Sequence, residues 1–108
     1  MARSIMEEIQ REVSENRVII YMKGTKAFPQ CGFSAAAVEV LKSLDVPFKD
    51  INVLADPEKW QALKTFSNWP TIPQIYIGGK FIGGCDIIRE MHAKGELASL
   101  VQVSLKED

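Results

Sequence analysis

The sequence predicts an α/β fold in which strands and helices alternate along one domain of 108 residues. Apolar residues recur at helical spacing in several segments, and short apolar runs of strand length, bounded by Gly or Pro, lie between them. Such alternation is typical of a sheet whose faces are covered by helices. A hydrophobic content of 46% suffices for one modest core, and we expect a single domain over residues 1–108.

The first half of the chain predicts a helix, a strand, a loop and a second helix. Apolar residues at helical spacing indicate a helix over residues 4–15, which we expect to end at Asn16. The nearly continuous apolar run 18–22 is typical of a strand buried on both faces. Gly24 and Pro29 mark residues 23–30 as a loop. The helix that follows Cys31 is expected to bury Phe33, Ala37, Val40, Leu41 and Leu44, and to end before Pro47.

The second half predicts a strand at 48–53, with Ile51 and Val53 on one side, and a helix at 57–67 with Asp56 as its N-cap. Residues 74–77 and 80–82 flank Gly78-Gly79, which is a hairpin signal. Residues 83–86 open another helix, with Asp86 as a candidate N-cap, and a short amphipathic helix follows at 96–103. This pattern constrains the order of the strands in the sheet without determining it.

The charge balance excludes broad classes of partner. Thirteen basic and 14 acidic side chains give a formal net charge of -1, so we expect no nucleic acid partner. No apolar run approaches the roughly 18 residues of a spanning helix, so we expect no membrane partner either. Two distant cysteines favour a reducing compartment: the bacterial cytoplasm or, in a eukaryote, the cytosol, the mitochondrial matrix or a plastid.

Cys31 carries the clearest functional signal, in the run Cys31-Gly32-Phe33-Ser34 between a predicted strand and a predicted helix. A thiol just inside a helix start meets unpaired backbone N–H groups, which favour the thiolate. Lys23, in the preceding loop, adds positive charge. A dithiol motif would place a second cysteine at position 34, where this chain has serine. Cys31 must therefore form any disulfide with a small thiol, with another protein, or with Cys85, whose alternative interpretation is a buried structural cysteine.

Five blocks in order resemble a monothiol glutaredoxin of the Cys-Gly-Phe-Ser type. They are Tyr21-Met22-Lys23-Gly24-Thr25, Cys31-Gly32-Phe33-Ser34, Trp69-Pro70-Thr71-Ile72-Pro73-Gln74, Gly83-Gly84-Cys85-Asp86-Ile87 and Gly95-Glu96-Leu97. The resemblance implies a thioredoxin-like (glutaredoxin) fold with a four-stranded mixed sheet flanked by helices. It also implies a cis Pro73 beside the thiol, a glutathione groove, and a 2Fe-2S cluster that bridges two monomers.

The implied glutathione site draws on several segments. Cys31 is the catalytic thiol and the ligand to the cluster. The resemblance places Lys23 against a glutathione carboxylate, the backbone of Ile72 against its cysteinyl part, and Asp86 against its amine. The N–H groups at a helix start bind anions, which fits the γ-glutamyl carboxylate. The candidate glutathione residues are Lys23, Cys31, Gly32, Phe33, Lys64, Ile72, Pro73, Gly84, Cys85 and Asp86.

Trp60 departs from the family pattern. The family usually has an arginine at this position to hold the glycyl carboxylate, and tryptophan cannot form that ion pair. Lys59 or Lys64 could substitute, and we include Lys64 among the candidates. The identity of the small thiol is therefore left open.

Two functions are expected to compete. The first is an iron-sulfur cluster carrier or scaffold in cluster assembly and iron homeostasis. A 2Fe-2S cluster needs about four thiolate-type ligands, so two copies of Cys31 and two glutathiones would complete the set in a cluster-bridged homodimer. Resemblance adds a BolA-like protein and apo iron-sulfur proteins as further partners.

The alternative is a glutathione-dependent oxidoreductase that acts through Cys31, for which we expect weak or no activity. A redox sensor that joins Cys31 to Cys85 is a third possibility.

Overall fold

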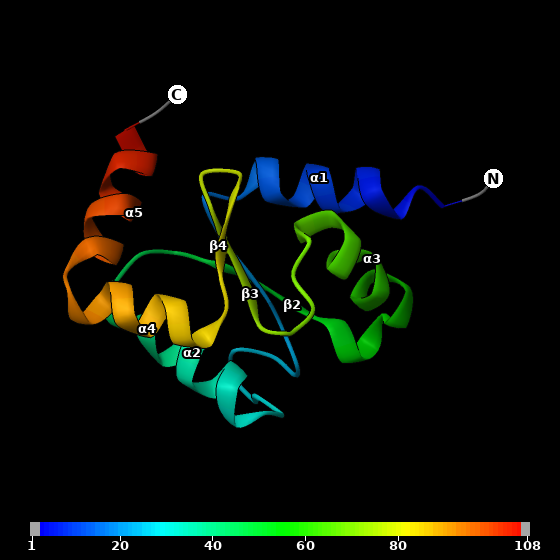
Figure 1. The fold of residues 1–108 in the computed structure, drawn as a ribbon, viewed down its shortest axis with the longest axis horizontal. Coiled ribbons are helices and arrows are strands. Elements are labelled where there is room, and N and C mark those ends of the chain that lie inside the picture. The colour runs from blue at the N-terminus through cyan, green and yellow to red at the C-terminus, as the bar shows by residue number, and fades with distance from the viewer. Residues whose placement is uncertain (1–2, 107–108) are drawn as a thin grey trace.

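A four-stranded mixed sheet forms the centre of the molecule, as the resemblance implied (Figure 1). The computed structural model describes residues 3–106. β1 (Val18–Met22) runs parallel to β2 (Lys49–Asn52) and antiparallel to β3 (Gln74–Ile77), which pairs antiparallel with β4 (Lys80–Gly83). The strand order is therefore β2-β1-β3-β4. β1 is buried along its whole length, which explains its continuous apolar run.

Helices cover both faces of the sheet. The alternation of side chains along β1 divides the core into two layers. Ile19 and Tyr21 belong to the core beneath α1 (Ile5–Glu15) and α3 (Pro57–Ser67). Val18, Ile20 and Met22 belong to the core beneath α2 (Gly32–Ser43), α4 (Cys85–Ala93) and α5 (Glu96–Lys106). Figure 1 shows α1 and α3 as one pair, and α2 with α4 as another.

Several element boundaries differ from the sequence prediction by one to three residues. The strand predicted at 48–53 ends at Asn52, because Val53 begins the 3-10 turn η1 (Val53–Ala55). The Asn52 side chain accepts hydrogen bonds from the N–H groups of Leu54 at 3.0 Å and Gly24 at 2.9 Å, which turns the chain out of the sheet. The last helix continues beyond residue 103 and includes Lys106, the last residue that the structure describes.

The expected burial of Phe33 is wrong: its side chain is 62% exposed. The buried face of α2 consists of Ser34, Ala37, Val38 and Leu41, whose spacing of three and four residues defines one stripe. Phe33 precedes that stripe by one position and projects to solvent. Val40 and Leu44 lie at the edge of the core and are partly buried, as a position beside the stripe requires.

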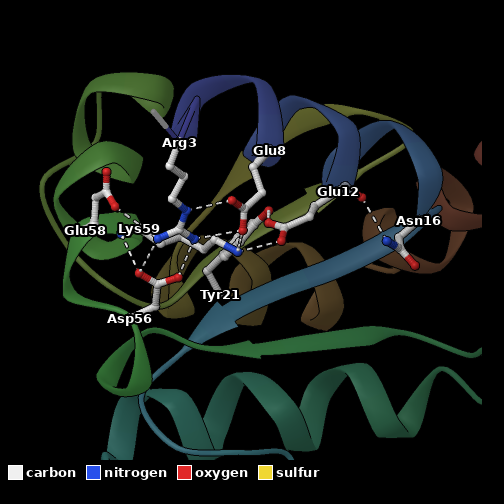
Figure 2. A network of polar contacts seen from close by, with 8 residues as sticks. All are labelled: Arg3, Glu8, Glu12, Asn16, Tyr21, Asp56, Glu58 and Lys59. Carbon is white, nitrogen blue, oxygen red and sulfur yellow. Dashed lines mark hydrogen bonds and ion pairs between the residues drawn. The ribbon is translucent and has the colours of Figure 1, made fainter. Parts of the chain in front are cut away.

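An ionic network joins α1 to the start of α3 (Figure 2). Arg3 pairs with Glu8 at 2.8 Å and with Asp56 at 2.7 Å. The Nζ of Lys59, whose residue is only 4% exposed, lies 2.6 Å from Glu12 and 2.9 Å from Glu8. Because these carboxylates neutralise a buried ammonium, the network fixes α3 against α1.

No helix among residues 3–106 is both long enough and apolar enough to cross a membrane.

Candidate functional site

A cleft of about 470 Å³ opens at one end of the sheet and contains most of the predicted site. Its wall is assembled from the end of β1, the start of α2, one side of α3, the loop before β3 and the start of α4. The volume is within the usual range for small-molecule sites. The residues that line it are Lys23, Cys31, Phe33, Trp60, Lys64, Trp69, Pro70, Thr71, Ile72, Pro73, Gly84, Cys85, Asp86 and Ile87.

Hydrogen bonds within the loop from β1 to α2 fix the backbone of Lys23. The backbone N–H of Lys23 donates to Oγ of Ser34 at 3.1 Å, and its carbonyl accepts from the N–H of Gln30 at 2.9 Å. Gly24 adopts φ +88°, and a Cβ there would lie 2.5 Å from the carbonyl oxygen of Phe28. The loop therefore requires glycine at this position. Ser34, which is fully buried, replaces a second thiol with a hydroxyl that anchors Lys23.

Cys31 is the N-cap residue of α2 and lies directly before the helix, between strand and helix as predicted. Its side chain makes no capping hydrogen bond, but the first backbone N–H groups of the helix face it. The N–H of Ser34 contributes most to lowering the pKa of the Cys31 thiol. The N–H of Phe33 and the Lys23 ammonium act in the same direction, against partial burial. The predicted thiolate character of Cys31 is thus supported by its surroundings.

The start of α4 contributes the opposite side of the cleft. Gly84 is the N-cap of α4, so the interpretation of Asp86 as an N-cap, the alternative to a role at the site, is wrong; Asp86 lies in the first turn, exposed at the cleft. A Cβ at Gly84 would come within 3.2 Å of the Pro73 carbonyl oxygen, so a side chain there would crowd the cleft. Cys85 is 5% exposed, and burial raises the pKa of its thiol. The two cysteines, both free thiols, therefore differ sharply in reactivity.

Lys59 and Lys64, the two possible substitutes for the missing arginine, have different surroundings. Lys64 lines the cleft, together with Trp60. Lys59 points to the other side of α3, where it pairs with Glu8 and Glu12, so it cannot serve a ligand in the cleft. The Nζ of Lys23 lies over the indole of Trp60, 5.2 Å from the ring centroid. Trp60 therefore contacts the Lys23 ammonium through its ring, whereas the arginine usual at this position would itself supply a positive charge.

The loop before β3 forms the floor of the cleft. The Ile72–Pro73 peptide bond is cis, as the resemblance implied, and both residues are buried. Trp69 lines the cleft and packs on Phe81 with ring centroids 5.7 Å apart.

Nine of the ten candidate glutathione residues line the cleft, and Gly32 does not. Sequence reasoning did not select Trp69, Pro70, Thr71 and Ile87. Membership in the matching blocks was the available signal for these four residues.

The chain on its own offers few metal ligands. Within residues 3–106, no three His, Cys, Asp or Glu side chains gather closely enough to hold a metal ion. Cys31 is the more exposed of the two cysteines and the one whose pKa is lowered. A metal cluster at this cleft would therefore need ligands from outside the chain.

Comparisons with known proteins agree with this geometry. The family model described as Glutaredoxin matches residues 18–82. The chain is 50% identical to a Synechocystis sp. protein named uncharacterized monothiol glutaredoxin ycf64-like, over 90% of this chain and 91% of that protein. It is 45% identical to a probable monothiol glutaredoxin 2 of Rickettsia typhi, over 98% and 96% of the two chains. The solution structure of reduced apo GrxS14 from poplar superposes with a TM-score of 0.83 at 46% identity, over 94% and 93% of the chains.

Proposed function

Because this chain belongs to the glutaredoxin family and is similar to proteins named monothiol glutaredoxins, we propose that it binds glutathione in the cleft and carries a 2Fe-2S cluster shared by two copies of the chain. One observation supports this proposal above the others. The activated thiol of Cys31 lies at a ligand-sized cleft, and a buried hydroxyl occupies the position where a second active thiol would stand.

The charges of the cleft match those of glutathione, which bears two carboxylates and one ammonium. Lys23 and Lys64 offer cations on one side of the cleft. At the other side, the start of α4 offers the N–H groups of Cys85 and Asp86, which suit a carboxylate. The exposed carboxylate of Asp86 suits the ammonium. The tripeptide would then extend past Cys31 with its own sulfur beside the Cys31 thiolate.

The cluster is cargo in this proposal. Two copies of Cys31 supply two thiolates, and two bound glutathiones supply the others, which gives the usual four. Low-mass thiolates exchange readily, so a cluster held partly by glutathione can be passed on to apo iron-sulfur proteins. Phe33 is 62% exposed and Phe28, in the preceding loop, is 74% exposed, so the thiol is flanked by apolar surface that a second copy or a BolA-like protein could cover.

The lowered pKa of Cys31 also favours a second candidate function, the removal of glutathione from mixed disulfides. The Cys31 thiolate would attack the glutathione sulfur and release the protein thiolate. A second glutathione thiolate would then attack the Cys31–glutathione disulfide, which regenerates Cys31 and forms glutathione disulfide. We expect this turnover to be weak, because a second glutathione must be positioned to attack the mixed disulfide. The tightly held Lys23 loop is expected to position only the glutathione that is already bound.

Anaerobic reconstitution with iron, sulfide and glutathione tests the proposal. The expected product is a coloured dimer with visible absorption, two irons and two glutathiones per pair of chains. Cys31→Ser is expected to give no colour. Cys85→Ser keeps the backbone N–H at its position and is expected to retain the colour. If no low-mass thiol supports a coloured dimer, the carrier function fails, and turnover as fast as a dithiol glutaredoxin would favour the enzyme.

A further inference from the structure

The contact between Lys23 and Trp60 joins two walls of the cleft. Lys23 follows the end of β1, and Trp60 lies in α3; 37 positions of sequence separate them. The Nζ of Lys23 lies 5.2 Å from the centroid of the Trp60 ring, within the range of a cation–π interaction. Both residues line the cleft beside Cys31. A ligand bound at Cys31 would therefore lie beside this contact.

Lys23 has a fixed backbone and an ammonium that pairs with no carboxylate of the described residues 3–106. Its N–H and C=O are both engaged, by Ser34 and Gln30. Across residues 3–106, no carboxylate lies within ion-pair distance of its ammonium. The residue is half-buried, and its ammonium lies over the Trp60 ring. Its N–H donors stay available to a ligand.

Trp60 is presented from a well-anchored helix. Its neighbour Lys59 is buried and pairs with Glu8 and Glu12 of α1 (Figure 2). Asp56 accepts a hydrogen bond from the N–H of Lys59 at 3.2 Å, which caps the start of α3. Because these contacts hold the first turn of α3, the indole has a defined place on the cleft wall.

We propose that Trp60 is a positioning residue that holds the Lys23 ammonium at the cleft wall, where it receives a carboxylate of the bound thiol. This inference rests on the proposed function, since it takes the ligand to be a low-mass thiol that carries carboxylates. An aromatic face attracts a cation without neutralising its charge. A carboxylate in its place would compete with the ligand for the same ammonium.

Binding of S-methylglutathione, which cannot form a disulfide, tests the role of Trp60. Dissociation constants are measured by NMR titration for the wild type, Trp60→Leu, Trp60→Phe, Lys23→Met and the Trp60→Leu/Lys23→Met double variant. Trp60→Leu is expected to weaken binding by about threefold to tenfold, the range that a cation–π contact supports. Trp60→Phe retains an aromatic face and is expected to rescue most of that loss.

The double variant separates positioning from a merely structural role. In the Lys23→Met background, Trp60→Leu is expected to change the dissociation constant by less than about twofold, because the cation that it orients is absent. Equal losses in both backgrounds, or no loss from Trp60→Leu alone, would overturn the inference and leave the proposed function standing. If the wild type binds no S-methylglutathione, the glutathione site fails and the inference fails with it.

Discussion

Lys59 of α3 and Lys23, which contacts Trp60 of the same helix, show two different uses of a lysine. Lys59 is 4% exposed and pairs with two carboxylates of α1, so its charge is neutralised and serves to join two helices. Lys23 is half-buried at the cleft, has an indole as its neighbour, and pairs with no carboxylate of residues 3–106. The comparison indicates that the ion pairs of Lys59 stabilise this fold, while the ammonium of Lys23 would receive a ligand carboxylate under the proposed function.

The largest expected effect is the loss of unfolding free energy on replacing Lys59, the lysine that joins α1 to α3. Lys59→Met leaves Glu8 and Glu12 without their shared ammonium and is expected to lower the free energy of unfolding by about 2 to 3 kcal/mol. That cost is below the figure for fully buried pairs, because both carboxylates are partly exposed. Urea denaturation measures it.

Lys64→Met is the matched control, since it removes a cleft-lining lysine from the same helix. Its unfolding free energy is expected to stay within about 0.5 kcal/mol of the wild type, as for most exposed positions. Its affinity for S-methylglutathione is expected to fall. Equal destabilisation by the two substitutions would remove the distinction between the two kinds of lysine.

A smaller effect is expected on the cleft side, at Ser34. Ser34→Ala deprives the N–H of Lys23 of its acceptor and is expected to cost about 1 to 2 kcal/mol of unfolding free energy. Ser43→Ala is the control in the same helix, because the Ser43 hydroxyl donates to the Val40 carbonyl at an exposed position. A loss from Ser34→Ala no larger than that of the control would show that the loop does not depend on this hydroxyl.

The smallest effect concerns pH. Arg3, and then Lys59, lower the pKa of Glu8 from its ordinary value near 4.5 to about 2. A carboxylate with a depressed folded-state pKa stabilises the protein above its unfolded pKa, and this stabilisation is lost as the pH falls from about 5 toward 2. After solvent screening we expect on the order of 1 kcal/mol.

Urea midpoints at pH 7 and pH 3 measure the contribution of Glu8. The difference between the two midpoints is expected to be smaller in Glu8→Gln than in the wild type. Glu7→Gln controls for the loss of one negative charge from the same helix. Identical pH dependence in the wild type and Glu8→Gln would contradict the assignment of this stabilisation to Glu8.

Local patterns were sufficient for most of the secondary structure. The apolar run 18–22 became β1, and Pro57 with its Asp56 cap marked the start of α3. Phe33 was misplaced because helical periodicity near a helix start does not say which stripe faces the sheet. The strand order also depends on pairings between distant segments.

The sequence by itself determined the reactive residue and the family. Cys31 before a helix start, serine at position 34 and the five matching blocks are all readable in order along the chain. Only the tertiary structure decided which lysines face the cleft. Lys59 pairs with Glu12, which is 47 positions away, so Lys59 does not line the cleft, whereas Trp60 does and meets Lys23 there. Such contacts join segments far apart in the chain, so no local pattern of residues encodes them.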